Sequence, residues 1–230
     1  MSRSPRDTAP PAECSDKIRG FSSSKGLVVP THSNDAAKHF RARIKQFAET
    51  PLPQGQLVML GDSLIELNDW SVSSPGSVEL QNRGISGDTS DGILFRISEV
   101  SESYPRAVFI LIGTNDLWTR NSPSKTACNI VAAAKLIRTS SPDTKVFVQT
   151  VFPQNWAPAS NDRVRSVNAL LKESSADSGF VIVDTYAVMV DETGNLNPAF
   201  TNDGLHLNEA GYTVWSSMIS ETMRLHGLIE

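Results

Sequence analysis

One serine of this chain stands where a nucleophile would be expected. The motif Gly-Asp-Ser-Leu at residues 61–64 directly follows an apolar run over residues 57–60. A buried strand that ends in this way brings the Ser63 hydroxyl to the carboxyl edge of a sheet, where open α/β sheets bind their ligands. A helix N-terminus beside it favours a developing negative charge, because its N–H groups point outward. Taken alone, Gly-Asp-Ser is more often a turn and a helix cap, and Ile65 excludes a Gly-x-Ser-x-Gly elbow.

A histidine near the C-terminus could take the serine proton. In Asp-Gly-Leu-His at residues 203–206, the spacing lets Asp203 accept a hydrogen bond from Nδ1–H of His206 and leaves Nε2 free. We expect the other histidines, His32, His39 and His226, to be structural or solvated, since they lie near a polar arm, in an early helical pattern and in the last helical turn. Asp-x-x-His alone is a weak signal, but here it follows the last expected strand.

Two further loops offer donors for an oxyanion. Gly87 lies in Asn-Arg-Gly-Ile-Ser-Gly-Asp-Thr, residues 82–89, where a residue without Cβ lets the backbone approach a substrate closely. Asn115, in Gly-Thr-Asn-Asp at residues 113–116, carries an amide that can donate directly. Judged singly, tight turns and Asx turns explain these loops at least as well. Together with the serine and the Asp–His pair, they complete the inventory that an acyl-transfer site needs.

Four other side chains lie near the expected site. Trp118 follows the third expected strand and Trp156 the fourth. Both could line a substrate pocket, and core packing or contact with a partner is an equal alternative for each. Asp62 is a further candidate for substrate binding, although for Asp62 and Asp88 we favour capping of loop amides, since no second base is needed. No metal or other cofactor is expected, because the acids are scattered and His206 has one nearby carboxylate.

Strand and helix patterns alternate along the chain and can position these residues. A helix is predicted over residues 34–49 by apolar side chains at helical spacing, with Asn34 as its N-cap. The expected strands are continuous apolar runs, typical of strands buried on both faces, at residues 57–60, 77–82, 107–113, 145–151 and 180–185. Helical patterns lie near residues 64–70, 90–103, 124–139, 162–175 and 209–226, the last with Asn208 as its cap. This alternation predicts an α/β fold with a parallel sheet and helices on both faces.

Length and composition are those of an ordinary soluble globular protein. The 230 residues are 39% hydrophobic and 20% charged, with a net charge of −4, so nothing indicates a nucleic-acid partner. The longest apolar run, residues 107–112, is far shorter than the roughly 18 residues that suggest a membrane span. Residues 1–25 are predicted to be a disordered arm and residues 26–230 a single domain. No apolar segment follows Met1, which favours a cytoplasmic location; the oligomeric state is unreadable.

Together, the motifs resemble the SGNH (GDSL) hydrolase family of esterases and lipases. The motifs at residues 61–64, 82–89, 113–116 and 203–206 match the family's blocks in order, over roughly residues 57–225. The resemblance implies a three-layer α/β/α, flavodoxin-like fold and no metal requirement. It makes Ser63 the nucleophile, His206 the base and Asp203 the acid that orients the base. It also assigns the oxyanion hole to the backbone N–H groups of Ser63 and Gly87 and to the Asn115 side chain.

The second and third motifs narrow the resemblance to one branch, which contains platelet-activating-factor acetylhydrolase-like proteins and bacterial carbohydrate O-acetylesterases. This branch implies a serine esterase that uses an acyl-enzyme to hydrolyse short-acyl, often acetyl, esters of carbohydrates or other small alcohols. Three alternatives stay open: a lysophospholipase- or lipase-like enzyme, an acyltransferase on the same site, and a carbohydrate-binding relative without turnover. The intact Ser63, Asp203 and His206 argue against the last of these.

Overall fold

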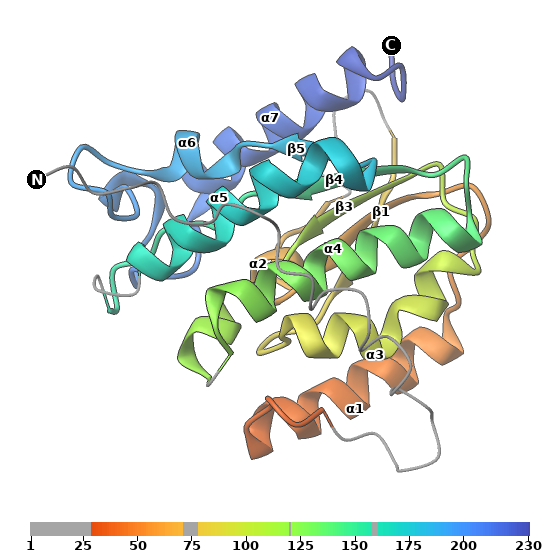
Figure 1. Cartoon of the computed structure of the whole chain (residues 1–230), viewed down its shortest axis with the longest axis horizontal. Helices are drawn as coiled ribbons and strands as arrows, with labels where there is room; N and C mark the ends of the chain where they lie inside the picture. Colours follow the sequence, from red (N-terminus) through yellow and green to blue (C-terminus); the bar gives the residue numbers. More distant parts are fainter. Residues whose placement is uncertain (1–28, 71–77, 120, 158–160) are drawn as a thin grey trace, which may run out of the picture.

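Strands and helices alternate along the chain as the sequence predicts (Figure 1). The structure is a computed structural model that describes residues 29–70, 78–119, 121–157 and 161–230; the predicted arm at residues 1–25 lies outside these ranges. The strands are β1 (Leu57–Gly61), β2 (Leu80–Gly84), β3 (Ala107–Leu111), β4 (Lys145–Gln149) and β5 (Val181–Val183). The α-helices are α1 (Asn34–Glu49), α2 (Ser63–Glu66), α3 (Ser90–Ser101), α4 (Pro123–Ser140), α5 (Asn161–Ser178), α6 (Thr185–Met189) and α7 (Glu209–Leu225). Short 3₁₀ helices are η5 (Asn115–Trp118) and η7 (Pro198–Phe200).

The five strands form one parallel sheet in the order β2-β1-β3-β4-β5. This order is the flavodoxin-like one, so the predicted fold class is confirmed. Strand β1 pairs with β2 on one side and with β3 on the other, and the chain therefore winds away from β1 in both directions. In such sheets ligands bind in the crevice outside the carboxyl ends of the strands at this switch point. Ser63 lies there, two residues after Gly61 ends β1.

Different helices cover the two faces of the sheet, which gives the predicted three layers (Figure 1). Successive side chains of a strand point to opposite faces. Val58 and Leu60 of β1 accordingly pack in one apolar cluster with residues of α3, α4 and α5. Leu57 and Met59 pack in a second cluster with residues of α2 and α7. All four side chains are buried, as expected for a strand that reads as a continuous apolar run.

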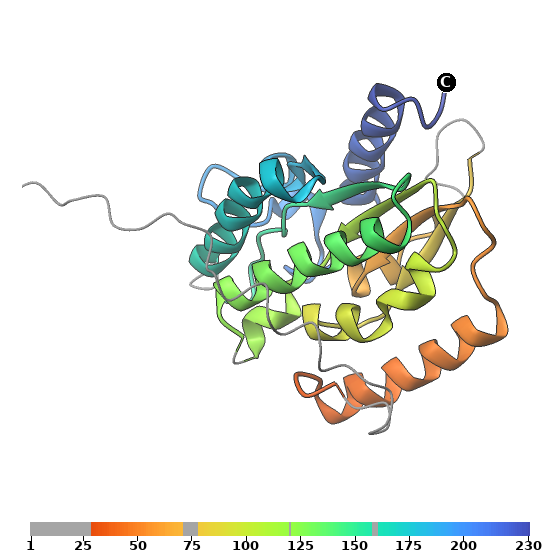
Figure 2. The same cartoon turned by 45° about the vertical axis from the view of Figure 1, so that its right-hand side comes forward.

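Helix α1 lies beside α3, at the edge of the molecule near β2 (Figure 2). Its buried Phe40 and Phe47 pack with Val29 and with Ile85, the residue that follows β2. The guanidinium of Arg83 also lies 4.6 Å from the centre of the Phe47 ring. Helix α1 and the segment before it therefore cover the loop that carries the second motif.

Several element ends differ from the prediction. The N-cap of α1 is Ser33 rather than Asn34, because the Ser33 hydroxyl accepts a hydrogen bond from the Ala36 amide. The strands expected over residues 107–113 and 145–151 end sooner, at Leu111 and Gln149, where their pairing with neighbouring strands stops. Helix α6 and η7 have no counterpart in the prediction, since five and three residues are too few to show a helical period. The predicted Asn208 cap of α7 is confirmed.

The helix that begins at Ser63 is much shorter than the pattern over residues 64–70 predicts. It ends at Glu66, after four residues. The indole of Trp70 and the amide of Asn82 both donate to the carbonyl oxygen of Ile65, and the Asn82 amide also donates to that of Glu66. Side chains thus satisfy the carbonyl groups that a longer helix would use. Asn82 belongs to β2, so this capping also ties the serine turn to the neighbouring strand.

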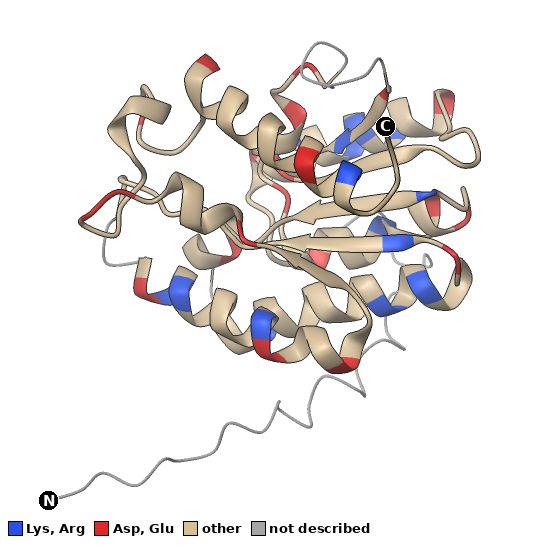
Figure 3. Cartoon of the chain, turned by 90° about the horizontal axis from the view of Figure 1, so that it is seen from above, with Lys and Arg blue, Asp and Glu red and all other residues tan. Residues whose placement is uncertain are grey.

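The surface carries mixed charge (Figure 3). In this view, lysine and arginine positions are interspersed with aspartate and glutamate positions along the helices. In the ranges that the structure describes, no helix combines the length and the apolar character needed to cross a membrane.

Candidate active site

The Ser63 hydroxyl lies just beyond the end of β1, on the first residue of α2. Gly61 makes the tight exit from the strand possible, because a Cβ there would lie 2.1 Å from the carbonyl oxygen of Leu111. Asp62 is the N-cap of α2, and its Oδ1 accepts a hydrogen bond from the Leu64 amide at 3.1 Å. The Gly-Asp pair therefore builds the turn and leaves Ser63 partly exposed beside a helix N-terminus.

A continuous set of contacts joins Ser63, His206 and Asp203. Nε2 of His206 lies 3.1 Å from Oγ of Ser63, although the two residues are 143 positions apart in the sequence. On the other side of the ring, Nδ1 lies 2.8 Å from Oδ2 of Asp203. The fold thus brings together the three residues that sequence reasoning proposed, in the order serine, histidine, aspartate.

Local hydrogen bonds hold the Asp203 carboxylate in place. Its Oδ1 accepts from the amides of Leu205 and His206, at 2.9 and 2.8 Å, and Gly204 between them has a φ of +84°. Partial burial acts to raise the pKa of Asp203, but the hydrogen bonds from the His206 side chain and from the two amides outweigh it and lower the pKa to about 2. Asp203 is therefore ionised at neutral pH and can hold His206 in the tautomer with a proton on Nδ1.

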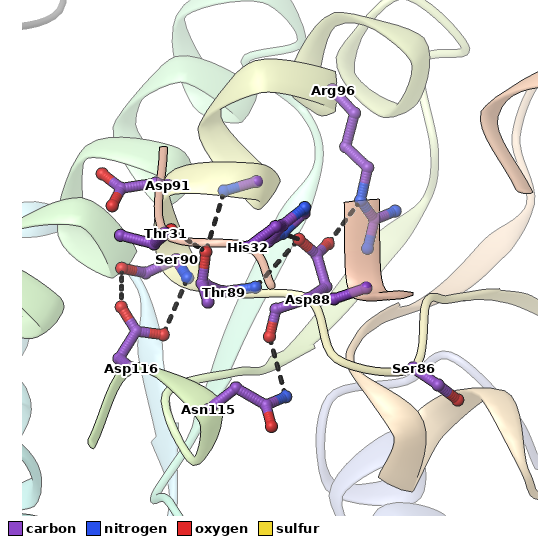
Figure 4. A network of polar contacts seen from close by, with 12 residues as sticks. Thr31, His32, Ser86, Asp88, Thr89, Ser90, Asp91, Arg96, Asn115 and Asp116 are labelled. Carbon is purple, nitrogen blue, oxygen red and sulfur yellow. Dashed lines mark hydrogen bonds and ion pairs between the residues drawn. The ribbon is translucent and has the colours of Figure 1, made fainter. Parts of the chain in front are cut away.

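Gly87 and Asn115 line one pocket of about 530 Å³. They follow β2 and β3, the two strands that flank β1. Gly87 has a φ of +78°, a conformation that other residues rarely adopt. The side-chain nitrogen of Asn115 donates to the carbonyl oxygen of Asp88 at 2.8 Å (Figure 4). A carboxamide has two N–H bonds, so this contact orients the Asn115 amide and a second N–H remains to donate.

Asp62 is buried beside Ser63 instead of lining the pocket. Among the described residues its Oδ2 has no hydrogen-bond partner. Burial raises the pKa of Asp62 to about 7, and the carboxylates of Asp88 and Asp116 add to the rise, against the lowering effect of the Leu64 amide. A carboxyl group in this position is out of reach of a substrate. The capping role expected of Asp62 fits the structure, whereas the substrate-binding role does not.

The indoles of Trp118 and Trp156 lie together next to the histidine. Their ring centroids are 5.9 Å apart in an edge-to-face arrangement, and the Trp156 ring is 6.4 Å from that of His206. Nε1 of Trp156 donates to the carbonyl oxygen of Asp203. The two tryptophans are 50% and 55% exposed, so packing in the core does not explain them. Trp118 also lines the pocket that contains Gly87 and Asn115.

The side chains that hold Asp88 are not among the site residues predicted from the sequence. His32 and Arg96 contact the two oxygens of its carboxylate, at 3.0 and 2.9 Å (Figure 4). His32 is structural, as expected for the histidines outside the Asp-x-x-His motif, but its partner lies 56 residues away and sequence spacing gives no sign of it. Arg96 did leave a signal, since it adjoins Ile93 and Ile97 on the buried side of α3. A charged residue in that position needs a buried partner.

The sequence over residues 58–214 matches the model of one family, described as the GDSL-like Lipase/Acylhydrolase family. This match covers more than half of the chain and contains Ser63, Gly87, Asn115, Asp203 and His206. The chain belongs to the GDSL-like lipase/acylhydrolase family. The resemblance seen in its motifs is thereby confirmed, and the protein is a hydrolase of carboxylic esters.

The share of a relative's own length that aligns with this hydrolase differs from one relative to the next. Platelet-activating factor acetylhydrolase IB subunit alpha2 of Homo sapiens is 30% identical over 165 residues, which are 68% of this chain and 70% of that protein. N-acylneuraminate cytidylyltransferase of Escherichia coli O18:K1:H7 is 29% identical over 175 residues, which are 73% of this chain but 40% of the cytidylyltransferase. The crystal structure of a GDSL-like lipase from Bacteroides thetaiotaomicron has a TM-score of 0.69 at 26% identity and covers 81% of this chain and 98% of that one.

Proposed function

We propose that this hydrolase is a serine esterase in which Ser63 is the nucleophile, His206 the base and Asp203 the acid that orients it. The observation that carries the proposal is the continuous set of contacts, 3.1 Å from Oγ to Nε2 and 2.8 Å from Nδ1 to Oδ2. An activated serine requires contacts in this order. The backbone N–H groups of Ser63 and Gly87 and the Asn115 side chain would bind the oxyanion.

In the first half-reaction, Oγ of Ser63 attacks the ester carbonyl carbon while Nε2 of His206 takes the hydroxyl proton. The carbonyl electron pair moves to oxygen, and the N–H donors stabilise the resulting tetrahedral oxyanion. When this intermediate collapses, the bond to the alcohol oxygen breaks and Nε2 returns the proton to that oxygen. The alcohol leaves, and the acyl group remains on Ser63. Ionised Asp203 stabilises the imidazolium between the two proton transfers.

In the second half-reaction, water replaces the alcohol. Nε2 of His206 takes a proton from the water as its oxygen attacks the acyl carbon, and a second tetrahedral oxyanion forms at the same donors. Collapse of that intermediate breaks the bond to Oγ of Ser63, which regains its proton from the imidazolium. The carboxylic acid is released, and the enzyme returns to its starting state.

We further propose short-acyl, above all acetyl, esters of carbohydrates or other small alcohols as the substrates. One relative is named an acetylhydrolase, and the name of another refers to a sugar, N-acylneuraminate. The exposed pair Trp118 and Trp156 offers flat aromatic surface beside His206, which suits stacking of a sugar ring. The adjoining pocket, at about 530 Å³, has the size of a small-molecule site.

The test is hydrolysis of p-nitrophenyl esters from acetate to octanoate by the wild type and by Ser63→Ala. We expect turnover that falls with acyl length in the wild type and a loss of at least about 1000-fold in kcat in Ser63→Ala, since the triad acts as a unit. Circular dichroism should show that the variant is folded. Ser217→Ala, on the exposed side of α7, is the matched control and should keep wild-type activity.

Other outcomes would redirect the proposal. Wild-type turnover by pure Ser63→Ala would contradict the mechanism. Activity that rises with acyl length would favour the lipase-like alternative, and ester formation with an added alcohol acceptor would favour an acyltransferase. A folded wild type that hydrolyses none of the esters, and binds an acetylated oligosaccharide without cleaving it, would support the carbohydrate-binding alternative.

A further inference from the structure

The segment before β1 is not part of the family match, which begins at residue 58, yet it contacts the proposed site. Residues 30–33 and Ala36 form one wall of the pocket whose other wall includes Gly87 and Asn115. Phe40 packs in the apolar cluster of Ile85, two residues before Gly87. These contacts place the segment over the loop that carries Gly87. One polar side chain of the segment also reaches further into the interior.

That side chain is His32, which binds a buried carboxylate. Its imidazole is 1% exposed, and Nε2 lies 3.0 Å from Oδ1 of Asp88. The other carboxylate oxygen accepts from Nε of Arg96 at 2.9 Å (Figure 4). Asp88 is itself fully buried, so its charge depends on these two partners and on the Thr89 amide, which donates to Oδ1. Removal of a partner from a buried charge is costly, and the group then moves to find another.

The backbone of Asp88 contacts one of the proposed oxyanion donors and adjoins another. The carbonyl oxygen of Asp88 accepts from the Asn115 side chain at 2.8 Å, and this contact sets the orientation of the amide. Gly87, whose N–H is the second proposed donor, is the preceding residue. Arg96 adds a link to the nucleophile, because it also donates to the carbonyl oxygen of Gly61 at 2.9 Å. A shift of the Asp88 carboxylate would therefore be passed to both donors.

We infer that His32 is a positioning residue for the oxyanion hole, acting through Asp88 on Asn115 and Gly87. The inference rests on the proposed function, since it concerns the donors assigned there. His32 touches no reacting atom in this arrangement. Its expected effect is on kcat rather than KM, because the donors act on the charge that develops in the transition state.

The test compares three substitutions of His32 in the full chain, with p-nitrophenyl acetate as substrate. His32→Gln can offer an amide N–H near the present Nε2 and should keep kcat within about threefold of the wild type. His32→Asn has a shorter reach, and His32→Ala has no donor. We expect both to lose about 10- to 100-fold in kcat, less than complete loss of one oxyanion donor, with KM changed by less than about threefold.

Two controls separate positioning from mere loss of stability. Phe40→Leu loosens the same segment, since Phe40 contacts the His32 ring at 4.8 Å, but it removes no hydrogen bond to Asp88. At a similar drop in melting temperature it should keep most of its kcat. In the Asn115→Ala background, His32→Asn should lower kcat by a much smaller factor than it does in the wild type. The effects of two residues that act through one another are not additive.

Each result either supports or overturns the inference. A wild-type kcat in both His32→Asn and His32→Ala would overturn the inference. An equal loss of kcat in Phe40→Leu would overturn it as well, and so would kcat losses of His32→Asn and Asn115→Ala that are fully additive. If His32→Ala does not fold, the comparison of kcat between His32→Gln and His32→Asn decides the question alone. Ser63→Ala distinguishes the two proposals: if it is inactive while the His32 variants are normal, only this inference fails, whereas an active Ser63→Ala removes the proposed function as well.

Discussion

The two halves of the proposed site are built in different ways. The oxyanion half depends on side chains in the interior: Arg96 and Asp88 are 2% and 0% exposed. The proton-transfer half stands near the surface, where His206 and Asp203 are 31% and 46% exposed. Contacts between distant parts of the chain hold the first half. The second is held mainly by hydrogen bonds within residues 201–206.

Because one half is buried and the other exposed, substitutions in the two halves should affect activity and stability differently. A buried carboxylate cannot lose a partner without leaving an uncompensated charge. A substitution in the oxyanion half should therefore lower both the activity and the free energy of unfolding. Exposed ion pairs contribute little to stability because water screens them. Damage to the proton-transfer half should therefore lower activity alone.

The largest effect is expected from Asp203→Asn. An amide cannot favour the required tautomer of His206 or stabilise its cation, so kcat should fall by roughly 10³- to 10⁴-fold. The free energy of unfolding should change by less than about 1 kcal/mol, because the carboxylate is nearly half exposed. Its pKa is depressed to about 2, and the small stability that this provides is present at neutral pH and is lost only as the pH falls from about 4 towards 2.

Asp191→Asn is the matched control for that variant. Asp191 also accepts hydrogen bonds from loop amides, those of Thr193 and Asn195, but the described structure gives it no contact with a histidine. Steady-state kinetics and urea unfolding of both variants provide the comparison. A large loss of stability in Asp203→Asn, or an equal loss of activity in Asp191→Asn, would contradict the proposed separation.

Arg96→Met tests the buried half. Methionine keeps much of the volume but leaves Asp88 with one cationic partner fewer and removes the donors to the carbonyl oxygens of Gly61 and Arg83. We expect a loss of about 3–5 kcal/mol in the free energy of unfolding, together with reduced kcat. Arg41→Met, on the exposed side of α1, should change stability by less than about 0.5 kcal/mol. A stable, inactive Arg96→Met would show that the buried half separates activity from stability after all.

Asp62→Asn should give a smaller effect that depends on pH. Because burial raises the pKa of Asp62 to about 7, the folded chain binds a proton between about pH 4 and pH 7 that the unfolded chain has released. The stability from this proton is complete below about pH 4 and is lost as the pH rises through 7. Relative to the wild type, Asp62→Asn should therefore become more stable with rising pH, by on the order of 3–4 kcal/mol in the free energy of unfolding between pH 4 and pH 8.

Urea unfolding at several pH values checks this prediction. The neighbouring substitution Ser63→Ala removes no carboxyl group and is the control. The difference in the free energy of unfolding between Ser63→Ala and the wild type should stay constant over the same pH range. A difference between Asp62→Asn and the wild type that does not vary with pH would mean that the pKa of Asp62 is the same in the folded and the unfolded chain.

The sheet and the proton-transfer half were predictable because their signals are local. Strands buried on both faces read as apolar runs, and the motif at residues 203–206 places Asp203 and His206 within one turn. His32 and Arg96 were not predictable in the same way, since their contacts with Asp88 depend on how α1, α3 and the second motif pack. The predicted arm, the single domain over residues 26–230 and the cytoplasmic location stay predictions.

If Ser63 carries the acyl group during turnover, a fluorophosphonate should label this residue and no other. The reagent needs an activated serine and forms a stable tetrahedral adduct on it, so peptide mapping by mass spectrometry identifies the residue. We expect one adduct per chain, located on Ser63, with labelling slowed strongly in Asp203→Asn and absent in Ser63→Ala. An adduct on another residue, or labelling of Ser63→Ala at the wild-type rate, would contradict the account.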